Sequence, residues 1–170
     1  MNATYLDNNC NISNKYALSK IEEIKPDYFF IAQSEEHQKT DWIKISKYLK
    51  KIGGKKIVLI GPSPQWTPSL PFIIGQKYIN EYEDSINFNK NLFISKDTLT
   101  SKVIRIEKHL KNDYSGTQGI LYISLIDEVC NDSVCKVFVP GSQELLLYDY
   151  GHLTSSGSIL AAELINKKLN

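Results

Sequence analysis

The chain has 170 residues, enough for one domain with a buried core and short for two. Its 20 basic and 19 acidic side chains nearly cancel, so nothing in the charge indicates nucleic acid or an anionic surface as a partner. No stretch approaches the roughly 20 apolar residues that a membrane helix needs. The N-terminus also lacks the charged-then-apolar order of a signal peptide, which by itself indicates the cytoplasm. We therefore expect a single domain over residues 1–170.

Helical and strand patterns alternate along the first half of the chain. Apolar periodicity predicts amphipathic helices, and Trp42 falls on the core side of the second one. Continuous apolar runs between the helices are typical of strands covered on both faces. The predicted elements are a helix over 12–24, a strand over 27–33, a helix over about 40–51 and a strand over 56–61.

The second half continues this alternation after an irregular stretch with a short helix at 65–95. A helix over 98–111, a strand over 119–124 and a last helix over about 155–168 follow. Helices alternating with apolar strands predict a three-layer α/β/α fold around a parallel sheet. The sheet is one strand short, because only about ten polar residues precede the first helix. In such sheets, reactive groups collect beyond the carboxyl ends of the strands.

Two cysteines, Cys130 and Cys135, bracket a polar tetrapeptide. This spacing suits a small disulfide loop and is equally compatible with two free thiols. No second pair of ligands has the spacing of a zinc site, so we expect no bound metal.

A carboxylate and an imidazole lie on one short turn ahead of the last helix, at Asp149 and His152. At this spacing the carboxylate can orient the imidazole as a general base that takes a proton from a serine hydroxyl. The alternative is a helix-entry turn, in which Thr154 or Ser155 caps the helix and His152 is a surface residue.

The segment Tyr-Asp-Tyr-Gly-His-Leu-Thr-Ser-Ser-Gly-Ser at 148–158 resembles the D-x-x-H-L-S/T-x-x-G-A/S block that closes SGNH (GDSL-like) esterases and acetyltransferases. Three earlier segments agree with that family in order: 26–33, 54–64 with its Gly-Pro-Ser-Pro turn, and 126–135 with its two cysteines. More narrowly, the chain resembles the SGNH domain fused behind the acyltransferase-3 membrane domain of bacterial polysaccharide O-acetyltransferases. The resemblance covers nearly the whole chain.

The resemblance implies a flavodoxin-like fold and acyl transfer through a serine ester, with His152 as the base and Asp149 as its orienter. It implies an acyl donor and a carbohydrate acceptor as substrates, no metal or organic cofactor, and an acyltransferase-3 domain as partner. The domain would lie in the periplasm or at the membrane, where the cysteine pair would be oxidised. Gln33 stands where the family carries an oxyanion-stabilising side chain.

The sequence departs from the family at its start, because the Gly-Asp-Ser block that supplies the serine nucleophile does not occur. We expect either that the chain begins downstream of that strand or that the strand has been lost. In both cases the base and its orienter lack the group that they activate. Ser34 and Ser63, each after a predicted strand, are alternative nucleophiles.

A non-catalytic α/β module that binds a glycan or a protein is the alternative function. Trp66, in the loop after the 56–61 strand, is a candidate for lining a sugar-binding cleft, with simple packing as the alternative. His37 in a charged loop and His109 on a lysine-rich helix are predicted to lie on the surface.

Overall fold

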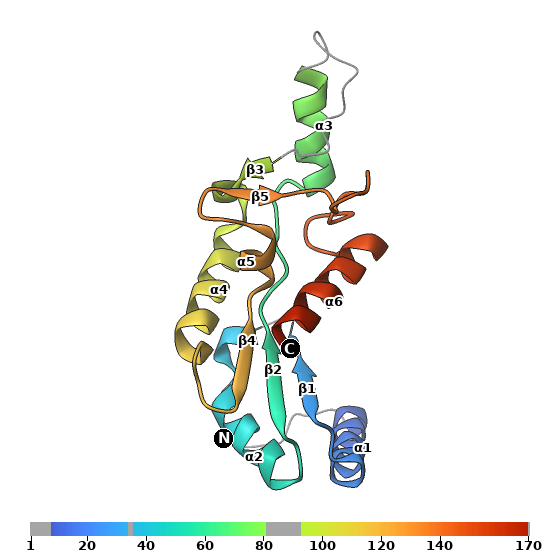
Figure 1. The fold of residues 1–170 in the computed structure, drawn as a ribbon, viewed down its shortest axis with the longest axis vertical. Coiled ribbons are helices and arrows are strands. Elements are labelled where there is room, and N and C mark those ends of the chain that lie inside the picture. Colours follow the sequence, from blue (N-terminus) through green and yellow to red (C-terminus); the bar gives the residue numbers. More distant parts are fainter. Residues whose placement is uncertain (1–7, 34–35, 81–92, 170) are drawn as a thin grey trace.

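The computed structural model describes residues 8–33, 36–80 and 93–169 (Figure 1). Its main sheet contains three parallel strands, β1 (Tyr28–Ile31), β2 (Lys56–Ile60) and β4 (Ile120–Ile123), in the order β1-β2-β4. The register places Ile31 opposite Leu59, and Leu59 opposite Tyr122. The predicted parallel α/β sheet is therefore confirmed. No strand precedes β1 in residues 8–27.

Helices connect and flank these strands. They are α1 (Asn8–Ile24), α2 (Trp42–Lys51), α3 (Leu70–Asn80), α4 (Ser101–Tyr114), α5 (Leu125–Val129) and α6 (Ser155–Leu169), with short 3-10 turns at His37–Lys39 and Lys96–Thr98. Side-chain caps begin several of them: Asp41 accepts the backbone N–H of Lys44 at the start of α2, and Thr100 accepts that of Val103 at the start of α4. Such caps satisfy amide groups that have no partner inside the helix.

The apolar core has two parts. One lies between the sheet and the helices α2 and α4, where Trp42, Leu59, Leu110 and Ile120 meet. The other is larger and joins α3, α4 and α5 to the segment before α6, with Trp66, Leu70, Val103, Ile126 and Leu146 among its members. The partly buried Leu160 and Leu164 bring α6 against this second part.

A second, two-stranded sheet was not predicted from the sequence. Its strands β3 (Phe93–Ser95) and β5 (Val134–Lys136) are antiparallel and three residues long each, too short for a periodic signal. Cys135 of β5 forms a disulfide with Cys130, so the disulfide is the alternative that the structure contains. Within the stretch predicted as irregular, α3 is the short helix, and residues 81–92 lie outside the described part of the chain.

Strand β1 is not covered on both faces, contrary to the prediction from its apolar run. Its side chains alternate between exposed and half-buried, and Tyr28 and Phe30 are 39% and 54% exposed. In β2, by contrast, Ile57, Val58 and Leu59 are all buried. The reason is position: β2 lies between two strands, while β1 pairs with β2 alone among the described residues. An apolar run does not reveal which of these two places a strand takes.

None of the helices in the described part of the chain is both long and apolar enough to cross a membrane.

Candidate active site

The turn from Tyr148 to Leu153 holds Asp149 and His152 together. Asp149 Oδ2 lies 2.6 Å from His152 Nδ1, and Asp149 Oδ1 accepts the backbone N–H groups of Gly151 and His152 at 2.9 and 2.8 Å. The hydrogen bond from the Gly151 amide, followed by those from the His152 amide and ring, lowers the pKa of Asp149 to about 2. The carboxylate is therefore ionised at neutral pH and can only accept.

This arrangement determines which ring nitrogen of His152 carries the proton. Because ionised Asp149 can only accept a hydrogen bond, Nδ1 of His152 is the donor, and Nε2 of the neutral ring is the acceptor. The His152 side chain is 58% exposed and that of Asp149 is 32% exposed. The pair has the geometry of an oriented general base whose basic nitrogen is accessible.

Backbone contacts on each side of the turn keep it in place. Trp66 donates its N–H to the Tyr150 carbonyl at 2.8 Å, and Thr154 donates its own to the Leu146 carbonyl at 3.0 Å. The Thr154 hydroxyl then accepts the N–H of Gly157 in the first turn of α6. A Cβ atom on Gly157 would lie 2.3 Å from the Leu146 carbonyl oxygen, so only glycine fits there. The helix-capping role considered for Thr154 is thus real and coexists with the Asp149–His152 pair.

A cavity of about 420 Å³ lies beside His152. Its walls come from four parts of the chain: the segment after β1, the segment after β2, helix α4 with the start of α5, and the turn itself. The polar and aromatic members of the lining are Gln33, His37, Ser63, Gln65, Lys102, Tyr150 and His152. The loops beyond the carboxyl ends of β1 and β2 therefore meet the turn that holds Asp149 and His152, as the parallel sheet predicts.

Besides His152, two of the predicted site residues lie in this cavity wall. Gln33 accepts a hydrogen bond from the Thr40 hydroxyl through Oε1 at 3.1 Å, which sets the orientation of its amide group. Ser63 donates its hydroxyl to the Gly151 carbonyl at 2.9 Å, next to His152 in the chain. Ser34 lies outside the described residues.

The prediction that Trp66 lines a cleft is wrong. Its side chain is 0% exposed in the larger part of the core, and its indole N–H donates to the Thr98 hydroxyl at 3.0 Å. The loop that carries Trp66 packs into the larger part of the core, whose other members come largely from later in the chain. Trp66 instead supports the turn through its backbone bond to Tyr150.

The surface prediction for His37 is also wrong, whereas His109 is exposed and paired with Asp113 at 3.2 Å. His37 is 1% exposed, its ring contacts Trp42 edge-on, and its Nε2 lies 2.9 Å from the Ile60 carbonyl oxygen. Burial lowers the pKa of His37, so Nε2–H is the donor to that carbonyl, and Nδ1 is a buried acceptor with no partner among the described residues. The charged residues around His37 in the sequence concealed its burial.

A buried acid beneath the cavity was also missed. Glu107 of α4 is 6% exposed and accepts the Tyr122 hydroxyl at 2.7 Å. Burial raises the pKa of Glu107, against the hydrogen bonds from Ser124 and Tyr122. A Cβ atom on Gly61, in the cavity wall, would lie 2.5 Å from the Tyr122 hydroxyl. The one sequence signal for this buried acid was its position on the face of α4 that the apolar periodicity turns toward the core.

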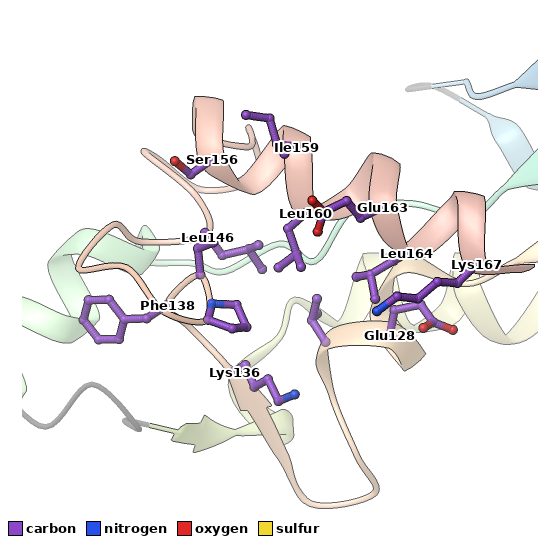
Figure 2. A pocket seen from close by; sticks show the side chains of 13 residues that line it. Glu128, Lys136, Phe138, Leu146, Ser156, Ile159, Leu160, Glu163, Leu164 and Lys167 are labelled. Atoms are coloured by element: carbon purple, nitrogen blue, oxygen red, sulfur yellow. The ribbon is translucent and has the colours of Figure 1, made fainter.

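A second cavity, of about 490 Å³, lies along α6 (Figure 2). Leu160 points from the helix toward Leu146, and Leu164, Glu128 and Lys167 lie together at one end. It contains none of the predicted site residues. Over residues 8–33, 36–80 and 93–169, no group of three or more histidine, cysteine, aspartate or glutamate side chains could hold a metal ion.

Comparison with known proteins identifies the family. The model of the SGNH domain (fused to AT3 domains) matches residues 3–167, so the chain belongs to this family. Among solved structures, the chain resembles the periplasmic domain of a lipopolysaccharide acetyltransferase from Salmonella ser. Paratyphi A, with a TM-score of 0.71 and 25% sequence identity. The match covers 94% of this chain and 62% of that one, so this chain spans about 62% of the neighbour's length. No curated protein sequence matches the chain.

Proposed function

We propose that residues 1–170 form one SGNH domain of an enzyme that transfers acyl groups to or from the hydroxyl groups of a bacterial cell-surface polysaccharide. The observation that carries the proposal is the 2.6 Å contact between Asp149 Oδ2 and His152 Nδ1, which leaves His152 Nε2 as a base beside a cavity. No metal or organic cofactor is required for this chemistry.

Three further observations support the substrate class and the location. The family is described as fused to AT3 domains, which suggests an acyltransferase-3 membrane domain as partner. The neighbouring structure is the periplasmic domain of an acetyltransferase that acts on lipopolysaccharide. The Cys130–Cys135 disulfide is of a kind that persists in oxidising compartments such as the periplasm. These observations support a location in the periplasm or at the membrane.

In the proposed reaction, His152 Nε2 takes the proton of a hydroxyl group while the oxygen of that group attacks the acyl carbonyl carbon. The bond between this carbon and the donor oxygen or sulfur then breaks, and the imidazolium returns its proton to the leaving group. With a serine nucleophile the sequence occurs twice, first forming the acyl-serine and then passing the acyl group to a sugar hydroxyl or water. Ser63 is the serine in the described cavity lining.

Gln33 is the candidate for stabilising the oxyanion in this reaction. Its side chain lies in the wall of the same cavity as His152, and its carbonyl oxygen is held by Thr40. The amide nitrogen is therefore the donating end of the group. In other enzymes, loss of one such donor costs about 3–4 kcal/mol of transition-state stabilisation.

Hydrolysis of 4-nitrophenyl acetate by the purified chain tests the proposal, with water as the acceptor. We expect His152→Ala to lower the rate at least tenfold, because general-base catalysis contributes roughly 10²–10⁴-fold. Asp149→Asn should also lower it, because the ring loses the acceptor that sets its tautomer. His109→Ala is the matched control, since His109 is another exposed histidine paired with an aspartate. Equal rates for His152→Ala and His109→Ala would contradict the proposal.

The second candidate is a non-catalytic module that binds a glycan or a protein. The observation that favours it is the Ser63 hydroxyl, which donates to the Gly151 carbonyl instead of to His152. Labelling with a fluorophosphonate probe separates the alternatives for this serine. If Ser63→Ala abolishes the labelling, Ser63 is a nucleophile. If ester hydrolysis does not depend on His152, the binding module is favoured.

A further inference from the structure

Two exposed tyrosine side chains flank the His152 imidazole. Tyr148 is 63% exposed and Tyr150 is 52% exposed. The Tyr148 ring is stacked on the imidazole, with centroids 5.7 Å apart and an angle of 17° between the planes. The Tyr150 ring meets it edge-on, at 5.3 Å and 72°. Of the two, Tyr150 also lines the cavity.

The backbone that carries Tyr150 is held firmly, so its ring is presented from a fixed position. The Tyr150 carbonyl accepts the N–H of the fully buried Trp66 at 2.8 Å. The next residue, Gly151, is buried and donates its N–H to Asp149. A Cβ atom on Gly151 would lie 3.0 Å from the Gln65 side chain, so the turn is packed against the segment after β2. A ligand that contacts Tyr150 therefore has little backbone to order.

The remaining cavity wall is rich in groups that recognise hydroxyls. Ser63 and Gln65 follow β2, and Gln33 follows β1. The volume of about 420 Å³ lies in the range of small-molecule sites. An aromatic face beside amide, hydroxyl and imidazole groups suits a ligand with one apolar C–H face and a rim of hydroxyl groups. A pyranose ring has this pattern.

We propose that the acceptor sugar ring stacks on the face of Tyr150, and that this contact places one of its hydroxyl groups beside His152. The inference rests on the proposed function, because it assigns the acceptor of that reaction. Tyr148 does not share this role: its ring packs on the imidazole and lies outside the cavity lining.

Binding without turnover provides the test. Methyl α-D-glucopyranoside, methyl α-D-galactopyranoside and methyl α-D-mannopyranoside are titrated into the full chain, and the tyrosine ring signals are followed by NMR. We expect at least one glycoside to shift the Tyr150 signals. Tyr150→Ala should weaken its binding about fivefold or more, whereas Tyr150→Phe should retain it within about twofold, because the ring face is kept.

Tyr148→Ala is the matched control, since it removes another exposed tyrosine from the same turn, and it should leave binding within about twofold of wild type. Absence of binding by all three glycosides, or equal losses for Tyr148→Ala and Tyr150→Ala, would overturn the inference. A failed proposal for acyl transfer gives a different pattern, in which the Tyr150-dependent binding persists while ester hydrolysis does not depend on His152. Thermal melts of each variant verify that it is folded.

Discussion

The turn around His152 and the edge strand β1 differ in how completely their neighbours hold them. Each residue from Leu146 to Thr154 that shapes the turn is tied by backbone bonds, by the Asp149 carboxylate or by contact with Trp66. Strand β1 has one paired edge among the described residues, and α1 likewise exposes Ile12, Tyr16 and Ile24. The candidate site is therefore supported by the larger part of the core, whereas β1 and α1 contribute exposed apolar surface.

The largest effect on stability is expected at Gly157, which brings α6 close to the turn. Gly157→Val places a side chain where a Cβ alone would lie 2.3 Å from the Leu146 carbonyl oxygen, and we expect a loss of about 2–3 kcal/mol in the free energy of unfolding. Gly75→Ala is the control, because a Cβ there meets no atom within 4 Å, and helix propensity favours alanine. Urea denaturation measures both. A tolerated Gly157→Val would show that the turn is looser than its contacts indicate.

A smaller, pH-dependent effect is expected at Glu107, below the cavity. Burial raises its pKa in the folded state, so the folded chain holds this proton more tightly than the unfolded chain does. The stabilisation of the fold by the protonated Glu107 side chain is fully present below the ordinary pKa of glutamate. It is lost as the pH rises through the raised pKa of the folded state. Glu107→Gln should therefore gain in melting temperature relative to wild type between pH 5 and pH 8. Exposed Glu22 serves as the control through Glu22→Gln, and the same pH trend in both variants would contradict the assignment.

The smallest change in folding stability is expected on the β1 side, where the effect should appear in self-association instead. Among the described residues β1 is paired along one edge only, and an open apolar strand edge can pair with another chain, so we expect residues 1–170 to oligomerise or to be poorly soluble. Phe30→Lys on β1 should shift sedimentation toward the monomer at a cost of less than about 0.5 kcal/mol. Phe72 on α3 is the matched control, because it is also 54% exposed, and Phe72→Lys should leave association unchanged. A monomeric wild-type chain with a sharp two-state melt would contradict this prediction.

Local sequence patterns predicted the longer helices and the three parallel strands. The burial of single residues depends on long-range packing and could not be predicted in this way. The longer helices follow from apolar periodicity and the three parallel strands from continuous apolar runs, whereas the short helix α5 was not predicted. Asp149 and His152 are only three residues apart, so their pairing could be predicted from the turn. The burial of Trp66 and His37 could not, because each is covered by residues distant in the chain. The disulfide remained one of two alternatives, since spacing does not report whether two thiols are joined.

The Asp149–His152 contact is made within a single turn, whereas the cavity beside it needs segments near residues 33, 61, 103 and 150 at once. The two properties therefore have different folding requirements. As denaturant is added, the proposed sugar binding should vanish with the global transition, while an oriented imidazole can persist in any partly folded chain that keeps the turn. The proposed hydrolysis of small esters and the proposed transfer to a polysaccharide would then depend on different amounts of native structure in the same molecule.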